Sequence, residues 1–254
     1  MRVGALALLV ATLAVGLGLG YGPTGTADLL PDLDQRAPSG LVVVSAGERF
    51  RLAFASAVEN SGAGPLVIEA SRPGTHVPTM RADQRIATAD GSSHVVEGVG
   101  VLRYVRSSDH RHWHLLDFER YELRRAADYS LVGDDRKTGF CLGDRYATAT
   151  GNGRSAAFVS RCGLDRPRLL RLRQGISPGF GDDYVAALEG QYIDITNVPS
   201  GRYVLVHRVN PQGLLLESDY GNNAASMLVR LRWVEGRPRV RTVAVCPDRD
   251  RCGR

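Results

Sequence analysis

The sequence predicts an all-β protein: a single, antiparallel β-sandwich-like domain with long loops. Three observations lead to this class. Short apolar or alternating runs recur along the chain, and Gly, Asn, Asp and Pro interrupt them at close intervals. No segment keeps the 3.6-residue apolar period of an amphipathic helix over any length. Since neither an internal repeat nor a linker divides the chain, we expect one domain over residues 28–254.

The N-terminal segment has a different composition. Met1-Arg2 supplies a positive start, and residues 3–20 are apolar or small apart from Thr12. This pattern is typical of a secretory signal, and its length also permits an uncleaved membrane anchor. We therefore expect residues 1–27 to be a signal peptide or anchor, and the remainder to be secreted, with no contact to a membrane except through such an anchor.

Apolar runs bounded by turn residues predict strands in the first half of the chain, at residues 41–45, 50–58, 65–70, 84–88, 93–97 and 101–104. Asp90-Gly91 predicts a hairpin turn. Residues 71–83 are expected to form a loop.

Similar runs predict strands in the second half, at residues 120–123, 129–132, 192–198, 202–209, 225–233 and 239–245. Pro199-Ser-Gly201 predicts that 192–198 and 202–209 pair as a hairpin. Residues 143–161 and 174–183 are rich in Gly or polar residues and are expected to be loops.

A histidine-rich stretch, His110-Arg-His112-Trp-His114, follows the first set of strands. Alternate side chains of a strand point to one face, so the three imidazoles share a side. Neutral imidazole binds copper, zinc, iron and nickel. A flat strand separates the outer two histidines by about 13 Å, so a single ion requires the strand to curl or bulge. A His-rich exposed strand without metal is the alternative.

Composition adds three constraints. The net charge is +5, and the basic residues are spread along the chain without interleaved aromatics, so we expect no nucleic-acid partner. Lys137 is the only lysine among 32 basic residues, and its amine can act as a nucleophile where arginine cannot. The four cysteines allow three disulfide pairings, of which proximity favours Cys141–Cys162 with Cys246–Cys252.

Four motifs in order resemble the catalytic domain of the lysyl oxidase family. They are the three alternating histidines, Lys137-Thr-Gly-Phe-Cys-Leu142, the pair Gln174–Tyr184 and Gln191–Val198, and Glu217-Ser-Asp-Tyr-Gly-Asn-Asn223. The resemblance extends from Asp32 to Asn223, most of the chain after the signal segment.

This resemblance implies a copper amine oxidase with a self-made quinone, lysine tyrosylquinone, joined from Lys137 and Tyr184 as the catalytic cofactor residues. It implies that His110, His112 and His114 bind the copper. The expected reaction takes a primary amine, from peptidyl lysine or a small molecule, and O₂ to an aldehyde, ammonia and hydrogen peroxide. The general base is not identified by the sequence; Asp117, Asp183 and Asp194 are candidates, and Asp109 and Asp117 are candidates to orient the histidines.

The resemblance also implies a structural calcium site. Its ligands would be Asp32, Leu33, Glu217, Asp219, Asn222 and Asn223, which are rich in the oxygen atoms that calcium prefers. The alternative is an Asx-rich turn between strands. Such a site would tie the N-terminal segment to the last hairpin.

The chain departs from the family pattern at several positions. Trp113 replaces a tyrosine, Phe180 replaces a cysteine, and extra residues in the 143–161 loop lengthen the Lys137–Tyr184 separation. Two other functions remain open: a three-His zinc hydrolase or hydratase, and a non-catalytic, calcium-stabilised extracellular metal-binding module. His76, His94 and His207 are expected to be structural.

Overall fold

The computed structural model describes residues 26–107, 110–134, 139–186, 188 and 190–253. Within these ranges the only helix is one short 3-10 turn, η1 (Ala149–Gly151), and all other regular structure is strand. The all-β prediction is therefore confirmed. The proposed signal or anchor falls on residues 1–25, outside the described part of the chain. The described residues contain no helix with the length and apolar character needed to cross a membrane.

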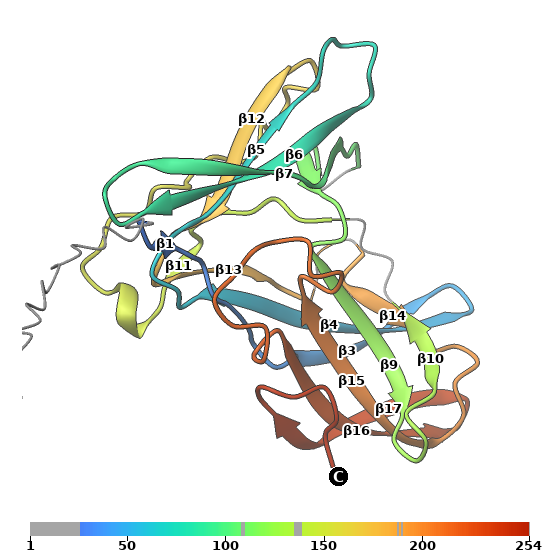
Figure 1. Cartoon of the computed structure of the whole chain (residues 1–254). Helices are drawn as coiled ribbons and strands as arrows, with labels where there is room; N and C mark the ends of the chain where they lie inside the picture. Colours follow the sequence, from blue (N-terminus) through green and yellow to red (C-terminus); the bar gives the residue numbers. More distant parts are fainter. Residues whose placement is uncertain (1–25, 108–109, 135–138, 187, 189, 254) are drawn as a thin grey trace, which may run out of the picture.

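The strands form three antiparallel sheets (Figure 1). The β7 sheet contains β12 (Arg171–Ile176), β5 (Leu66–Ser71), β6 (Thr79–Thr88), β7 (Ser93–Tyr104) and β8 (Trp113–Leu115) in spatial order, with β1 (Asp28–Leu29) paired to β6. The β15 sheet contains β10 (Leu131–Asp134), β9 (Glu119–Arg125), β15 (Gly201–Val209), β16 (Ala224–Val234) and β17 (Arg237–Cys246). The β4 sheet contains β11 (Tyr146–Ala147), β13 (Phe180–Tyr184), β4 (Arg49–Asn60) and β14 (Tyr192–Asp194), with β2 (Leu33–Gln35) and β3 (Ser39–Ala46) also paired to β4.

The β4 and β15 sheets form the sandwich. Figure 1 shows them as two layers in the lower part of the molecule, and the β7 sheet stands above them. Alternate residues of β4 point inward, among them Leu52, Phe54 and Val58, and they are buried with Leu205 and Val229 of the facing sheet. One continuous apolar cluster runs from this sandwich into the β7 sheet. Burial of one face of each strand explains why alternation was a reliable strand signal.

Two segments predicted as loops contain strands. Within 71–83, β6 begins at Thr79, and within 174–183, β12 and β13 leave only Ser177–Gly179 as a turn. Both predictions were wrong. β6 pairs with its sequence neighbours β5 and β7, whereas β12 pairs with β5 and β13 pairs with β4 across long sequence distances. These partners supply the backbone hydrogen bonds that local composition did not indicate.

The predicted hairpin at 192–209 was also wrong. β14 pairs with β4, placing Tyr192 opposite Ala53, while β15 pairs with β9 and β16. Pro199-Ser-Gly201 therefore carries the chain from one layer of the sandwich to the other. By contrast, the Asp90-Gly91 hairpin is confirmed, because β6 and β7 pair directly across it.

Candidate metal and cofactor site

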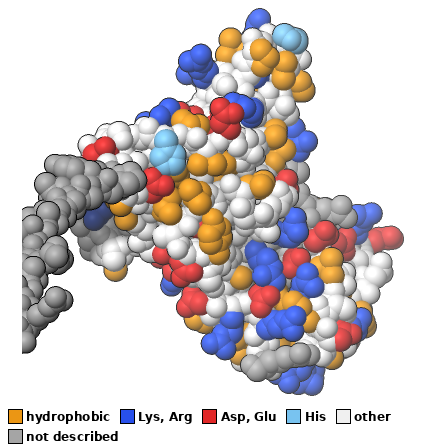
Figure 2. Space-filling view, viewed as in Figure 1, with side chains coloured by type: hydrophobic (Ala, Val, Ile, Leu, Met, Phe, Trp, Pro, Cys, Tyr) orange, Lys and Arg blue, Asp and Glu red, His pale blue; other side chains and the backbone are white. Residues whose placement is uncertain are grey.

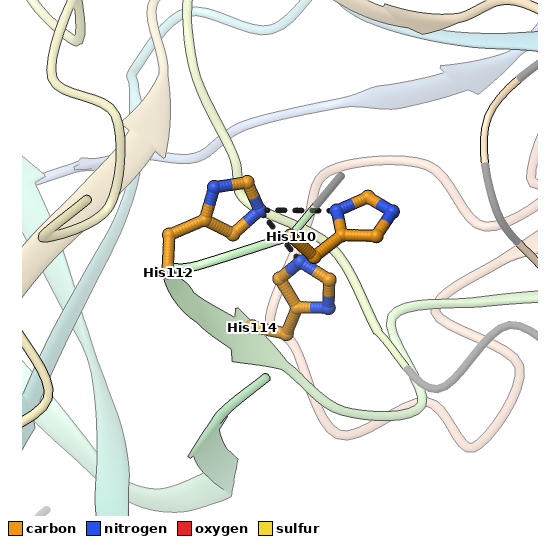
Figure 3. Close-up of side chains that lie close together, drawn as sticks. All are labelled: His110, His112 and His114. Carbon is orange, nitrogen blue, oxygen red and sulfur yellow. Dashed lines mark hydrogen bonds between the residues drawn. The ribbon is translucent and has the colours of Figure 1, made fainter. Parts of the chain in front are cut away.

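The three histidines converge on one point (Figure 3). One ring nitrogen from each lies within 4.8 Å of the others. His112 Nε2 is 2.7 Å from His114 Nε2 and 3.4 Å from His110 Nδ1. His110 and His114 are buried, and His112 is partly exposed. Among the described residues this is the only group of three or more His, Cys, Asp or Glu side chains close enough to hold one metal ion.

A bend before β8 produces this convergence. Only Trp113–Leu115 is strand, so His110 and His112 lie outside it. The Ser107 N–H donates to the His110 carbonyl at 2.8 Å, and the Val105 N–H donates to the His112 carbonyl at 3.0 Å. These two bonds bring Val105 against His112 and Ser107 against His110. The prediction that the strand must curl is confirmed.

Trp113 lies between two of these histidines but packs away from them. It is fully buried, its indole N–H donates to the Arg166 carbonyl at 3.2 Å, and the Arg72 guanidinium lies 4.6 Å from its ring centre. Its ring also meets Tyr104 edge to face. The tryptophan therefore anchors the β8 strand on the side opposite to the three histidines.

Residues Gly139–Cys141 connect the histidines with Tyr184. Phe140 and Leu115 exchange two backbone hydrogen bonds of 2.8 and 2.9 Å, next to His114. Gly139 has a φ of +152°, and a Cβ there would lie 2.5 Å from the Leu115 carbonyl oxygen and 3.0 Å from the His114 Cβ. A glycine is thus required for the close approach of this segment to β8.

Tyr184, at the end of β13, lies on the other side of the same segment. Its ring packs edge-on against Phe140 at 5.0 Å, and its hydroxyl accepts from the Cys141 N–H at 3.1 Å and lies 3.2 Å from the Cys141 carbonyl. The residue as a whole is partly exposed, but the hydroxyl is enclosed. Burial raises the pKa of the Tyr184 phenol well above its usual value, and the charges of Asp182 and Glu119 act in the same direction.

The structure identifies an acidic neighbour of Tyr184 that the sequence did not. Asp182 is 1% exposed, and its Oδ2 lies 3.4 Å from the Tyr184 hydroxyl. Arg145 holds its other carboxylate oxygen, with Nε 3.5 Å from Oδ1. The arginine also donates to the Cys141 carbonyl at 3.2 Å. Position alone was the available signal, since Asp182 precedes Tyr184 by two residues and so shares its face of the strand.

The three carboxylates suggested as candidate bases have other surroundings. Asp183 and Asp117 are exposed, and Asp117 has a positive φ of 55° in the turn after β8. Asp194 accepts hydrogen bonds from the backbone and hydroxyl of Thr196 at 2.9 and 2.6 Å. None of the three has a hydrogen bond to the described histidines or Tyr184. Asp109, the other suggested orienting residue, lies outside the described residues.

A second buried acid lies on the sandwich side of the site. Glu119 accepts a hydrogen bond from the Ser56 hydroxyl at 2.9 Å and one from the Tyr121 hydroxyl. The Tyr121 ring packs on His207, which is fully buried and also contacts Phe54. Burial lowers the pKa of His207 well below its usual value. His207 is a core residue, as expected.

The long 143–161 loop is closed at its base. The Cys141–Cys162 disulfide is present, and Cys246–Cys252 is the second bond, which confirms the pairing favoured by proximity. The Asp144 carboxylate accepts from the backbone N–H groups of Ala157 and Ser177 at 2.7 and 2.8 Å. Extra residues in this loop therefore do not separate Cys141 from Tyr184, which touch across 43 positions of sequence.

Five of the six residues suggested for calcium meet in one region, which we call the clasp: Asp32, Leu33, Glu217, Asn222 and Asn223. The Asn222 amide donates to Asp32 at 2.8 Å, and the Glu217 carboxylate accepts from the Leu33 N–H at 3.1 Å and the Asn223 amide at 2.6 Å.

The oxygen atoms of the clasp are only partly satisfied. The side-chain oxygens of Asn222 and Asn223 are buried and have no hydrogen-bond partner. Burial raises the pKa of the Glu217 carboxyl, and the nearby Asp32 charge adds to this. Asp219 is exposed, and its carboxylate accepts only from the Gly221 N–H, at 2.7 Å.

Lys137 lies outside the described residues, so its side chain is not placed. Of the other histidines, His94 is 2.9 Å from Asp28 and His76 is exposed on a turn. Neither approaches the three-histidine cluster. Apart from Lys137, every residue suggested for copper or for the quinone lies within one connected set of contacts through Gly139–Cys141.

Comparison with known proteins gives concordant matches. The lysyl oxidase family model matches residues 80–237. The chain is 32% identical to the protein-lysine 6-oxidase of Rattus norvegicus and 33% identical to that of Bos taurus, over 85% of this chain and 49% and 48% of those proteins. It is 32% identical to the protein-lysine 6-oxidase of Sus scrofa, over 80% of that protein. The chain thus spans about half the length of the rat and bovine relatives.

Proposed function

Because the chain belongs to the lysyl oxidase family, we propose that it is a copper-dependent amine oxidase. In this reaction a primary amine, water and O₂ give an aldehyde, ammonia and hydrogen peroxide. The substrate would be peptidyl lysine or a small primary amine. The observation that carries the proposal is the Gly139–Cys141 segment, which touches both the histidine cluster and Tyr184.

The histidine cluster fits copper. Three imidazole nitrogens within 4.8 Å of one another match the ligand type that copper accepts, and two of the three rings are buried. Backbone bonds from Val105 to His112 and from Ser107 to His110 support the position of these two histidines. His110, His112 and His114 would therefore hold copper without a large rearrangement.

Tyr184 and Lys137 would form the quinone. Copper and O₂ would supply oxidation of the tyrosine ring, and the quinone would supply the carbonyl that accepts electrons from the amine. Lys137 precedes Gly139 by two residues and Cys141 by four, and an extended chain advances at most about 3.6 Å per residue. Connectivity therefore keeps the backbone of Lys137 within about 14 Å of the Cys141 backbone that bonds to Tyr184.

Asp182 would act as the proton acceptor. Its Oδ2 lies 3.4 Å from the Tyr184 hydroxyl, so it would lie beside an amine bound at that ring. Burial keeps water away from this carboxylate, and Arg145 fixes its orientation. The carboxylate would take a proton from the carbon next to the amine nitrogen.

The clasp would hold calcium. Calcium prefers carboxylate and carbonyl oxygens, and the clasp offers two carboxylates and two buried amide oxygens without hydrogen-bond partners. A cation there would offset the cost of burying the charge of Glu217. Asp219 would become a calcium ligand if its exposed turn changed conformation. The predicted residues of this site are thus Asp32, Leu33, Glu217, Asp219, Asn222 and Asn223.

Export would suit this chemistry. Two disulfides indicate an oxidising compartment, and residues 1–27 would act as a signal or anchor. The protein would then bind copper and react with O₂ outside the cytosol. It would be secreted or held at the membrane by its N-terminus.

Peptide mass spectrometry after aerobic copper loading tests the cofactor. We expect one species that joins the Lys137 and Tyr184 peptides, absent from Lys137→Arg and from Tyr184→Phe. Amine-dependent peroxide release should follow the same pattern across the three proteins. Unlinked peptides in a protein that has bound copper would reject the quinone. If the zinc-loaded protein instead hydrolyses an ester or hydrates CO₂, the protein is a hydrolase or hydratase. Metal binding without any turnover would indicate a binding module.

A further inference from the structure

The β16–β17 hairpin carries five arginines on one face of the β15 sheet. Arg230 lies directly opposite Arg241, and Arg232 lies opposite Arg239, while Arg237 faces Val234 near the turn. Arg202 on the neighbouring strand β15 lies beside Arg230 and extends the set. All six arginines are exposed. We call these residues the arginine face: Arg202, Arg230, Arg232, Arg237, Arg239 and Arg241.

These arginines differ from others on the same sheet. Arg124 and Arg208 each form ion pairs with Glu122, and Arg208 also pairs with Asp250 at 2.8 Å. In the part of the chain that the structure describes, no member of the arginine face pairs with a carboxylate. Figure 2 shows basic side chains over the lower lobe, with acidic side chains among them. The arginine face therefore has no neutralising ion pair among the described residues.

The pairing of like charges opposes folding. Directly opposed residues on antiparallel strands have Cβ atoms about 4.5–5.5 Å apart, and like charges there destabilise the sheet. The face contains two such pairs side by side. The repulsion between these arginines does not help the sheet to fold. A bound anion would turn the same cluster of positive charges into a favourable interaction.

The arginine face also has a shape. Arg230, Arg232, Val234, Arg239 and Arg241 line a surface depression of about 270 Å³. This is smaller than the roughly 300–1,000 Å³ of typical small-molecule sites. It can seat a single acidic group of a longer molecule, with the surrounding guanidinium groups free to form paired hydrogen bonds to its oxygens.

We propose that the arginine face binds a linear acidic polysaccharide that carries sulfate or carboxylate groups. Strand geometry spaces the charges by about 6.8 Å along each strand and about 4.8 Å between strands. A polymer with regularly spaced acidic groups would meet several of them at once. This binding is separate from the proposed amine oxidation, because His114 lies on β8 of the β7 sheet, with the other two histidines just before it, and the arginines lie on the β15 sheet.

Nucleic acid fits this face less well. Single-stranded nucleic acid is bound mainly by stacking on aromatic rings, and Trp233 points to the opposite side, where it meets Phe50 edge to face and donates to the Val198 carbonyl. The arginine face itself has no aromatic residue. The two disulfides also indicate a compartment outside the cytosol, where acidic polysaccharides are found and nucleic acid is scarce.

Calorimetric titration of the whole copper-loaded protein with heparin oligosaccharides tests the proposal. We expect binding that weakens with added salt, and a loss of about tenfold in affinity for Arg232→Gln/Arg239→Gln, because this pair lines the depression. Arg232→Lys/Arg239→Lys should lose less heparin affinity, since lysine keeps the positive charge although it lacks the planar guanidinium group. The Gln variant should melt at the same temperature as the wild type or up to about 4 °C higher, because it removes a like-charge pair.

The matched control is Arg161→Gln/Arg168→Gln, which removes the same charge from exposed loop positions. Its heparin affinity should stay within about twofold of the wild type. Equal losses in the two Gln variants would show a general charge effect and reject the arginine face. Tighter binding of duplex DNA or phosphatidylserine vesicles than of heparin, at equal charge concentration, would reject a polysaccharide as the partner.

Discussion

The three histidines of the candidate metal site come from five consecutive residues, whereas the polar groups of the clasp come from segments 184 to 190 positions apart. Both regions gather side chains suited to metal ions. The histidine cluster is supported by the nearby backbone bonds of Val105 to His112 and of Ser107 to His110. The clasp instead depends on the arrangement of β2 against the connection between β15 and β16.

This difference leads us to expect that the histidine cluster matters for activity and the clasp for stability. A local cluster adds few contacts between distant parts of the chain, so losing one of its members should remove function and leave the fold. The clasp holds the first strands of the domain to its last third, so its loss should act on folding first. The four predictions below test this separation, from the largest expected effect to the smallest.

His112→Ala should eliminate activity with little change in stability. Its ring is central, since it lies within 3.4 Å of His110 and 2.7 Å of His114. Two histidines cannot complete the site, so bound copper and amine-dependent peroxide should both fall to background. Metal analysis and a melting curve check this, with His76→Ala as the control. A variant that keeps a full complement of copper would show that the cluster is not the metal site.

Asp182→Asn should lower kcat by about 10²–10⁴, the range for loss of a positioned proton acceptor. The amide keeps the shape of the side chain, so copper content and the Lys137–Tyr184 cross-link should persist. The control is Asp183→Asn, one residue away and exposed, which should stay near wild-type kcat. If the cross-link disappears with Asp182→Asn, the carboxylate acts in cofactor formation and not in amine turnover.

The same contrast explains what the sequence could predict. The alternating histidines and Tyr184 were identifiable because short motifs carried them, and residues 84–97 formed the hairpin that Asp90-Gly91 predicted. Asp182 could not be identified from the sequence. Its surroundings include Tyr184, which contacts Cys141, and Arg145, and both Cys141 and Arg145 are about 40 residues away in the sequence. β12 and β13 were missed for a similar reason, since their partners β5 and β4 are far away in sequence.

The prediction for residues 192–209 failed in a different way. The local signals for two strands and a turn were correct, but they did not specify the pairing. β14 contributes only Tyr192–Asp194 and joins β4, while β15 has a better partner on each side in β9 and β16. Competition between local and distant partners is decided by the burial of whole faces, which a single stretch of sequence does not contain.

Glu217→Ala should reduce stability more than activity. Its carboxylate accepts from the Leu33 N–H and from the amides of Asn210 and Asn223. The Leu33 and Asn223 donors would lose their partner, whereas the Asn210 amide would keep its bond to the Leu215 carbonyl. Each buried unpaired donor costs about 1–3 kcal/mol. A total near 3 kcal/mol would lower Tm by about 6–12 °C in a chain of this size. The control is Glu97→Ala at an exposed position with a surface ion pair, and a Tm for Glu217→Ala equal to that of this control would contradict the role of the clasp.

Asp219→Ala should give the smallest effect, and one that depends on calcium. Its carboxylate is exposed and accepts only from the Gly221 N–H within its own turn, so in the presence of a chelator the cost should be at most about 1 kcal/mol. With calcium added, the wild type should gain stability and the variant should gain less, because the ligand stabilises only the state that binds it. Melting curves of both proteins with calcium and with chelator measure this difference directly. If neither protein responds to calcium, the clasp is a hydrogen-bonded turn, and the contrast with the histidine cluster becomes one between a metal site and a purely structural contact.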